Sequence, residues 1–390
     1  MPITTISFGI AISIGQKHNV MKQIACTILF SLALMATACS KQTTASAQEE
    51  PFIESQRLYA MGEGSQFWRI PALLCLDDGT LLAVNDRRKY DYRDLPKDID
   101  IVYRRSTDNG KAWSEPQTLI EGQGEGKGYG DPALVQCENG DVLCLFAGHN
   151  GYFQSTVANP ICVFMSRSTD RGQTWGDTVN LTSVIWDASS GYHGAFVASG
   201  NGLRLKRGPH AGRVLFAAAA VRNGENVSDN YVIYSDDNGH TWQRSQKAFN
   251  KGDEAKLMEL NDGTVLISVR RTGARGYNHS EDGGVTWGTQ GYWNEMTVNA
   301  CNGEMLRVDE KTLIHSIPNS MSRENVSIFT SDDEGQSWHS PVLLVEGPSV
   351  YSSLTLLKDG TIGCFVEKGP DSGCDLWFYR FNVAWMLGQR

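Results

Sequence analysis

Five residues whose side chains could take part in chemistry stand at the ends of apolar stretches of this sequence. They are Arg69 in FWRIPALLCL, Glu254 in DEAKLMEL, Arg270 after DGTVLISV, Arg323 before NVSIFTS, and Tyr351 in GPSVYSSLTLL. Planar, permanently charged guanidinium groups suit the binding of a carboxylate, and a phenol can become a nucleophile when a base lies beside it. Each residue alone is best explained as a surface ion pair or a charge at a strand end. Together they favour one site assembled from distant parts of the chain.

A repeated motif, Ser-x-Asp-x-Gly-x-x-Trp, indicates which elements position these residues. The motif occurs five times, beginning at residues 106, 168, 235, 280 and 331. Four copies directly follow an apolar strand, and a polar stretch with another short strand comes after each Trp. Each copy is therefore expected on a hairpin, where Asp accepts hydrogen bonds from the turn, Gly supplies a positive φ and Trp folds back as a plug.

Calcium binding is the functional alternative for this motif, because DDNG resembles part of an EF-hand loop. That loop needs a glutamate at its twelfth position and flanking helices. Neither is present in the sequence. We therefore interpret the five copies as structural, so they predict how the chain folds and not what it does.

The spacing of the motif predicts an all-β fold, a six-bladed β-propeller in a single domain. The intervals between copies are 62, 67, 45 and 51 residues, which is typical of propeller blades that carry different insertions. At roughly 55 residues per blade, residues 55–390 give six blades of about four strands. A seven-bladed propeller, or one with fewer than six blades, is the alternative. The innermost strands converge on a central depression, where polar residues from distant blades can form one site.

Residues 1–47 are expected to be a leader, which leaves residues 48–390 for the propeller. After Met21 and Lys22 comes an apolar stretch that suits a signal peptide better than a membrane span. ATAC resembles a lipoprotein cleavage box with Cys39 as the lipidated residue, whereas ASA at 45–47 offers an ordinary cleavage site. The sequence thus predicts export to the periplasm, the outer membrane or cell surface, or the medium, with a lipid anchor and plain cleavage as alternatives.

Composition excludes several classes of function. The chain has 390 residues, 41% of them hydrophobic, and a formal net charge of −9. That charge argues against nucleic acid as a partner, although a few local arginines can still bind a small anion. No CxxC pair, HExxH, GxSxG or GxGxxG pattern occurs, so no metal site and no cofactor are expected.

From residue 55 to about 385, the sequence resembles the bacterial exo-α-sialidases, also called neuraminidases. RIP in WRIPALL is similar to the Phe/Tyr-Arg-Ile-Pro signature of that family, with Trp68 where Phe is usual. The five Asp-containing boxes are typical of the family, and GNGLRLKRGPHAGRVLFA at 200–217 resembles its segment between central blades. The resemblance implies hydrolysis, with retention, of terminal sialic acids on glycoproteins, glycolipids and oligosaccharides.

The same resemblance implies a role for each of eight residues. The substrate-binding residues would be Arg69, Arg270 and Arg323 as a clamp on the sialic acid carboxylate, Arg88 as a further pocket arginine, and Asp131 at the sugar 4-hydroxyl. The catalytic residues would be Tyr351 as nucleophile, Glu254 as its acidic partner and Asp94 as acid/base. Some positions have neighbours of the same type that remain alternatives: Arg271, Asp253, Arg87, and Asp91, Asp98 or Asp100 beside Asp94.

Other functions fit parts of this pattern. A non-catalytic propeller that binds or sorts partners would share the boxes, but it has no need of three arginines with Glu254 and Tyr351. A different glycosidase on the same scaffold would need two inward carboxylates and no carboxylate clamp. A trans-sialidase, or an enzyme that releases an anhydro product, would keep all the residues named above.

Overall fold

The computed structural model describes residues 50–187, 189–298 and 300–389. The predicted leader and Cys39 lie outside these residues, and the domain boundary at residue 48 stays a prediction. No helix within the described ranges is both long and apolar enough to cross a membrane.

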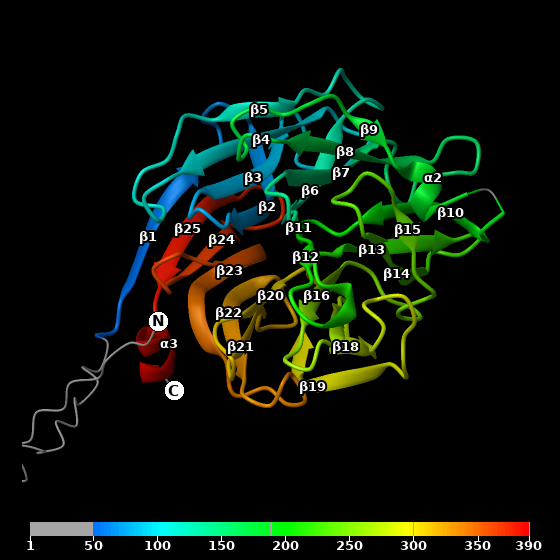
Figure 1. Cartoon of the computed structure of the whole chain (residues 1–390). Coiled ribbons are helices and arrows are strands. Elements are labelled where there is room, and N and C mark those ends of the chain that lie inside the picture. Colours follow the sequence, from blue (N-terminus) through cyan, green and yellow to red (C-terminus); the bar gives the residue numbers. More distant parts are fainter. Residues whose placement is uncertain (1–49, 188, 299, 390) are drawn as a thin grey trace, which may run out of the picture. The chain divides into compact units, whose positions relative to one another are not determined.

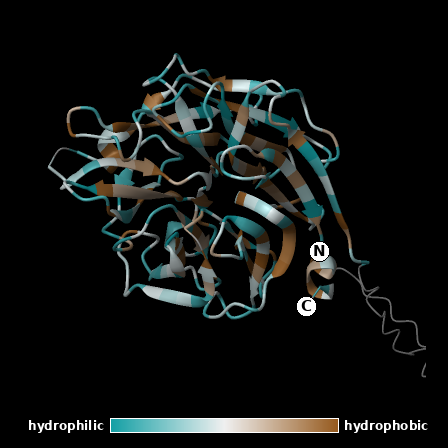
Figure 2. Cartoon of the chain, turned by 180° about the vertical axis from the view of Figure 1, so that it is seen from behind, coloured by the Kyte–Doolittle hydropathy of each residue, from teal (hydrophilic) through white to brown (hydrophobic). Residues whose placement is uncertain are grey.

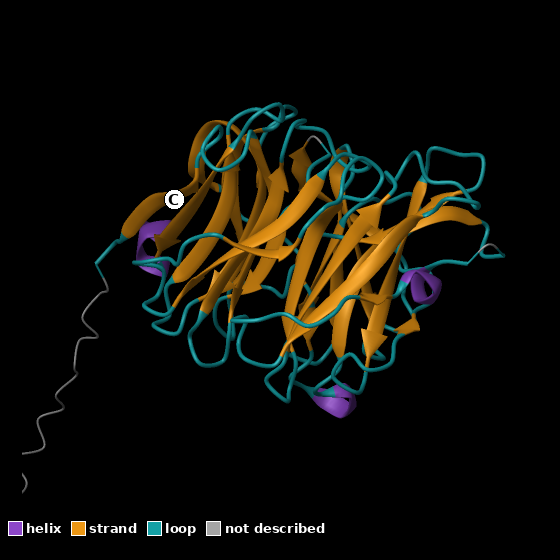
Figure 3. Ribbon diagram, turned by 90° about the horizontal axis from the view of Figure 1, so that it is seen from above, coloured by secondary structure: helices purple, strands orange, loops and turns teal. Residues whose placement is uncertain are grey.

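Strands dominate the described chain, as Figure 3 shows. The described helical segments are short: α2 (Thr182–Ile185), a 3-10 turn (Gly208–His210) and α3 (Val383–Gly388). Apolar residues lie along the strands, and polar residues predominate in the connecting loops (Figure 2). Many strands are buried along nearly their whole length, which requires side chains that tolerate burial on both faces.

The strands pair into five sheets, whose succession follows the colour order of Figure 1. The first is β2 (Phe67–Cys75), β3 (Leu81–Arg88), β4 (Ile99–Ser106) and β5 (Gln117–Ile120). The second, in spatial order, is β11 (Gly200–Asn201), β6 (Tyr129–Gln136), β7 (Val142–His149), β8 (Ile161–Ser168) and β9 (Val179–Asn180).

The third sheet is β10 (Tyr192–Val197), β13 (Val214–Arg222), β14 (Ser228–Ser235) and β15 (Gln243–Arg244), with β12 (Leu203–Arg204) beside β13. The fourth is β16 (Ala255–Glu259), β17 (Val265–Val269), β18 (Gly273–Ser280) and β19 (Gly291–Val298). The fifth, in spatial order, is β1 (Ile53–Tyr59), β25 (Asp375–Phe381), β24 (Ile362–Lys368), β23 (Val342–Leu356), β22 (Glu324–Ser331), β21 (Leu313–Pro318) and β20 (Glu304–Arg307).

The long strand β23 carries Tyr351 and joins two halves of the fifth sheet. Its first part pairs with β22, ending at the pair Pro348 and Glu324. Its second part, from Ser349 onward, pairs with β24. Because pairing continues through β23, the three strands on either side of it belong to one seven-stranded sheet, and the number of blades stays a prediction.

The sheets follow one another around a closed ring. Strand β2 packs against β6 and β23, β13 packs against β16, and β16 and β23 both pack against β20. Strand β1 pairs antiparallel with β25, so the first and last described strands lie side by side. This closure brings residues from both ends of the domain and from its middle to one central face.

The five motif copies link each sheet to its neighbour. In the first copy, Ser106 Oγ donates to Asp108 Oδ1 at 2.8 Å and accepts from the amide of Gly110 at 3.0 Å. Gly110 has a φ of 81°, and a side chain there would overlap the Phe378 ring of β25. The corresponding glycines of the other copies each lie against a leucine of the preceding sheet: Leu82, Leu143, Leu215 and Leu266.

Cysteines play no covalent role in the described residues, where all seven are free. Five of them, including Cys144 in β7 and Cys364 in β24, are buried. They behave as small apolar residues of the core.

Candidate active site

A cavity of about 630 Å³ lies where residues at the ends of the inner strands converge. Its walls come from all parts of the ring, from β2 near the start of the domain to the loop between β24 and β25. All eight residues singled out from the sequence line it: Arg69, Arg88, Asp94, Asp131, Glu254, Arg270, Arg323 and Tyr351.

Tyr351 and Glu254 are in direct hydrogen-bond contact within the cavity. The Tyr351 hydroxyl donates to Glu254 Oε2 at 2.5 Å. Glu254 lies directly before β16 and Arg270 directly after β17, and the amide of Arg270 donates to the Glu254 carbonyl at 2.8 Å. The β16–β17 hairpin therefore fixes Glu254 and Arg270 side by side beneath the phenol.

Burial sets the ionisation of the phenol. Desolvation raises the pKa of Tyr351 well above its ordinary value; Arg270 and Arg323 act to lower it, and Glu254 adds to the rise. The phenol is therefore neutral at neutral pH, with its proton directed at Glu254. It can act as a nucleophile only if Glu254 takes that proton during the reaction.

Three arginines surround Tyr351. Arg270 Nη1 donates to the Tyr351 hydroxyl at 2.7 Å and also contacts Glu254. The guanidinium carbons of Arg69 and Arg323 lie 5.8 and 5.7 Å from the centre of the phenol ring. Although desolvation opposes the charged form, neighbouring acidic groups raise the pKa of each arginine above its ordinary value, so all three stay charged.

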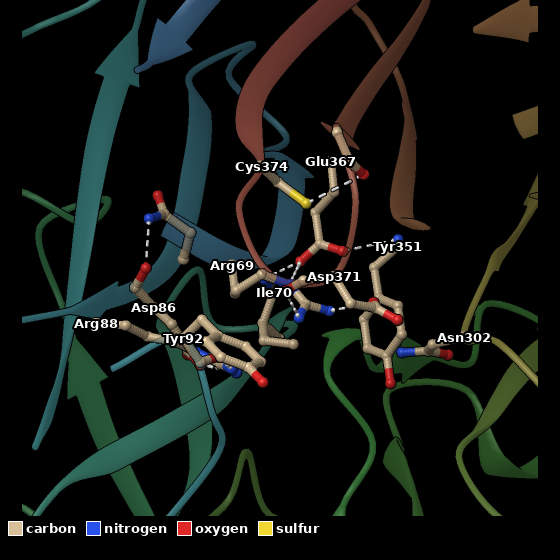
Figure 4. A network of polar contacts seen from close by, with 12 residues as sticks. Arg69, Ile70, Asp86, Arg88, Tyr92, Asn302, Tyr351, Glu367, Asp371 and Cys374 are labelled. Carbon is tan, nitrogen blue, oxygen red and sulfur yellow. Dashed lines mark hydrogen bonds and ion pairs between the residues drawn. The ribbon is translucent and has the colours of Figure 1, made fainter. Parts of the chain in front are cut away.

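Glu367, a fully buried carboxylate of β24, ties Arg69 to Tyr351 (Figure 4). Its Oε1 accepts from Arg69 Nε and from the amide of Ile70, both at 2.7 Å. Its Oε2 accepts from the amide of Tyr351 at 3.0 Å. Ile70 has a φ of 60°, a left-handed conformation that is costly for a β-branched residue. Glu367 thus holds β2 and β23 in the register that places Arg69 beside Tyr351.

Arg88 organises the opposite wall. Its Nη2 lies 3.0 Å from Asp86 Oδ2 and 2.7 Å from Asp94 Oδ1. The Asp94 side chain is 77% exposed and faces the cavity. Desolvation acts to raise the pKa of Asp94, but Arg88 and Arg69 outweigh it and the pKa is lowered.

Asp131 lies next to this group. Its amide donates to Asp86 Oδ1 at 3.1 Å, and its φ of 58° turns the backbone at that point. Desolvation, with the neighbouring Asp86, raises the pKa of Asp131 well above its ordinary value. Burial likewise raises the pKa of Asp86 behind it, to about 7, so both carboxyl groups resist ionisation more than an exposed aspartate does.

The structure distinguishes the predicted site residues from most of the neighbouring residues that the sequence left as alternatives. Arg271 lies over the Tyr292 ring, and Arg87 pairs with Asp100. The rivals of Asp94 also have other partners: Asp91 pairs with Arg93, and Asp98 and Asp100 with Lys89. None of these five alternatives lines the cavity. Asp253 does line it, but it reaches Arg270 at 3.5 Å, whereas Glu254 bonds Tyr351 directly.

Comparison with known proteins shows the family to which the chain belongs. The BNR repeat-like domain family matches residues 80–364. A sialidase of Micromonospora viridifaciens is 34% identical over 364 residues, which cover 87% of this chain and 55% of that protein. A sialidase of Bacteroides fragilis (strain YCH46) is 28% identical over 345 residues, covering 80% of this chain and 61% of that protein.

The chain belongs to the bacterial exo-α-sialidase family. It spans less than two thirds of the length of these two sialidases.

Solved sialidase structures share the fold. The Hadza microbial sialidase Hz136 superposes with a TM-score of 0.75 at 26% identity, covering 84% of this chain and 68% of that one. The intramolecular trans-sialidase from Ruminococcus gnavus superposes with a TM-score of 0.74 at 20% identity, covering 85% of this chain and 98% of that one. At this identity the likeness shows a shared fold only. Since sialidases are β-propellers, the predicted all-β propeller class is confirmed.

Several residues in this sialidase-family cavity, or directly behind its lining, were not predicted from the sequence. Asp86 and Glu367 lie within buried strands, where a carboxylate is rare unless it is paired. That rarity in LLAVNDRR and TIGCFVEK was the available signal. Asp371 had none, since it lies in a short polar loop. The apolar residues of the cavity lining had no distinctive signal in the sequence either: Leu95, Tyr152, Phe153, Ile161 and Phe196.

Proposed function

We propose that this chain is an exo-α-sialidase that hydrolyses terminal sialic acids of glycoproteins, glycolipids and oligosaccharides with retention of configuration. The observation that carries the proposal is the hydrogen bond from Tyr351 to Glu254 within a group of three arginines. A neutral phenol, a carboxylate base and three cations in one cavity suit attack on a sugar that carries its own carboxylate.

The arginines would bind the carboxylate of the sugar. Arg69, Arg270 and Arg323 come from separate sheets and all line the cavity. Guanidinium groups form paired, charge-assisted hydrogen bonds with carboxylates. Held by its carboxylate, the sugar would present its anomeric carbon to the Tyr351 hydroxyl in a fixed orientation.

The same carboxylate explains the choice of nucleophile. Sialic acid carries it on the anomeric carbon, so an attacking Asp or Glu would meet like-charge repulsion of about 4 kcal/mol at 4 Å with an effective dielectric near 20. A neutral phenol avoids this repulsion, and tyrosine nucleophiles are the recognised exception among retaining glycosidases. Glu254 would accept the phenolic proton as the Tyr351 oxygen bonds to the anomeric carbon.

Asp94 would serve as acid and then as base. In the first step it would protonate the leaving oxygen, and in the second it would deprotonate the water that releases sialic acid from Tyr351. Its exposed carboxyl lies beside Arg88 and lines the cavity. Two displacements at the same carbon give retention.

The proposal is tested with a fluorogenic aryl α-sialoside and the full chain. Release of the fluorophore together with free sialic acid, suppressed by the unsaturated sialic acid analogue, is the expected result. A folded protein that releases sialic acid from no linkage would overturn the proposal in favour of a binding function. Chromatography of the sugar product distinguishes free sialic acid from an anhydro or transferred product.

A further inference from the structure

One carboxylate of the chain itself contacts two arginines of the proposed clamp. Asp371 lies in the loop between β24 and β25, and its Oδ1 is 2.8 Å from Arg323 Nη1 and 3.4 Å from Arg69 Nη2. Its backbone carbonyl accepts a further hydrogen bond from Arg69 Nη1 at 3.1 Å. Figure 4 shows Asp371 between Arg69 and Tyr351. Its carboxylate therefore engages the same guanidinium nitrogens that a bound carboxylate would need.

The three arginines differ in how much they depend on Asp371. Arg69 is also paired with buried Glu367, and Arg270 with Glu254. Within the described residues, Arg323 forms an ion pair with Asp371 alone, and its Nη2 donates a hydrogen bond to the carbonyl of Ala300 at 3.0 Å. Asp371 is thus the counter-ion of the one clamp arginine that lacks a buried carboxylate.

The Asp371 side chain can leave without unfolding its loop. Its side chain is 48% exposed, in contrast to Glu367, whose side chain is fully buried. The loop is fixed by backbone bonds from the Gly369 amide to Pro348 and from the Gly373 amide to Pro370, at 2.8 and 2.9 Å. Rotation about the side-chain bonds of Asp371 therefore carries the carboxylate into water while the backbone keeps its place.

We propose that Asp371 is an internal competitor for the arginine clamp, displaced when the carboxylate of a ligand binds Arg69 and Arg323. The ligand's identity rests on the proposed sialidase function; the competition itself requires only a carboxylate. Two carboxylates at the same guanidinium nitrogens repel each other, so each ligand must first release Asp371. Asp371 would thereby weaken the binding of all anions and favour ligands that make further contacts in the cavity.

Asp371→Asn tests the proposal, because it removes the charge and keeps the shape of the side chain. Glu346→Gln is the matched control: Glu346 is an exposed carboxylate of β23 that forms no ion pair within the described residues. The dissociation constant of the unsaturated sialic acid analogue is measured by calorimetry. We expect it to fall by about three- to tenfold in Asp371→Asn, as for the loss of partly exposed ion pairs, and to stay unchanged in the control.

An unchanged or weaker affinity in Asp371→Asn would overturn the proposal, because a residue that merely orients the arginines should lower affinity when it is removed. Acetate, a carboxylate without a sugar, is a second probe that does not depend on sialidase activity. Acetate, compared with chloride at equal ionic strength, should raise the melting temperature of Asp371→Asn more than that of the wild type. Equal shifts would contradict the competition, whereas absent turnover by the wild type would contradict only the proposed function.

Discussion

The hydroxyl of Tyr351 lies 2.5 Å from Glu254 Oε2, although the two residues are 97 positions apart in the chain. Glu254 precedes β16, and Tyr351 lies in β23 just after that strand changes partner from β22 to β24. The contact therefore depends on the ring of sheets and on no local element. It places a proton acceptor against a buried, neutral phenol before any substrate binds.

Tyr351→Phe should reduce turnover of an aryl sialoside by at least about a hundredfold, because it removes the attacking oxygen. The ring remains to fill the same space, and Arg270 still pairs with Glu254. The melting temperature should change little. Steady-state kinetics and a thermal melt on the same preparation check both statements. Normal turnover in a correctly folded variant would exclude Tyr351 as the nucleophile.

Asp94→Ala should lose activity in a way that depends on the leaving group. Turnover of an aryl sialoside should fall about a hundredfold, because the base for the attacking water is missing. The value of kcat/KM reports the first step, in which the leaving group departs. It should fall less for the aryl sialoside than for a sialyl-oligosaccharide, because a phenolate can leave without being protonated and a sugar oxygen cannot.

Asp98→Ala is the control for Asp94, since Asp98 pairs with Lys89 outside the cavity. We expect near-normal kinetics for this variant on both substrates. Activity that survives in Asp94→Ala and is lost in Asp98→Ala would move the acid/base role to Asp98.

Arg323→Lys should raise KM for a sialoside about tenfold, with a smaller effect on kcat. Lysine keeps the charge but not the planar pair of donors, and one charge-assisted hydrogen bond contributes about 1.5–3 kcal/mol. Arg271→Lys is the matched control, because Arg271 stacks over Tyr292 and does not line the cavity. An equal rise of KM in both variants would contradict a specific role of the Arg323 guanidinium in binding the substrate.

Much of this site could be predicted because its chemistry demands rare residue types. Charged groups at the ends of apolar stretches, such as Arg69 and Arg270, stood out, and a family resemblance gave them roles. Residues that act on other protein groups were missed. Glu367 bonds Arg69 and two backbone amides, and only the pairing of β2, β23 and β24 reveals those partners.

The fold was predictable for a similar reason, and its details were not. The five repeated boxes indicated hairpins of similar design, because each needs the same Ser, Asp and Gly to close its turn. The continuity of β23 through two groups of strands leaves no mark in the sequence. The contact of Asp371 with the clamp likewise follows from tertiary packing, since its loop has no distinctive pattern.

The motif aspartates should make stability fall in acid. Although desolvation opposes it, hydrogen bonds from Thr241 and Ser235 lower the pKa of Asp237 to about 2. A carboxyl with a lowered pKa in the folded state stabilises the fold above its ordinary pKa near 4, and that stability is lost as pH falls towards 2. Asp237→Ala should lower the free energy of unfolding by about 1–3 kcal/mol at neutral pH and flatten its decline in acid.

Urea titrations of Asp237→Ala and the wild type at several pH values between 7 and 3 measure this difference. KM should not change, because Asp237 lies on a turn that does not line the cavity. A decline in acid identical to that of the wild type would show that this aspartate contributes nothing to acid sensitivity.

The central claim is that Tyr351 bonds to the anomeric carbon of the sugar, and a trapped intermediate tests it most directly. A sialosyl fluoride with a second fluorine at C3 carries a good leaving group, and the second fluorine slows the release of the sugar from the enzyme. After incubation with the full chain and proteolysis, mass spectrometry should find one sugar per protein, attached to the peptide that contains Tyr351. A sugar attached to the peptide of Glu254, or steady turnover of a slow substrate with no adduct at all, would contradict the account.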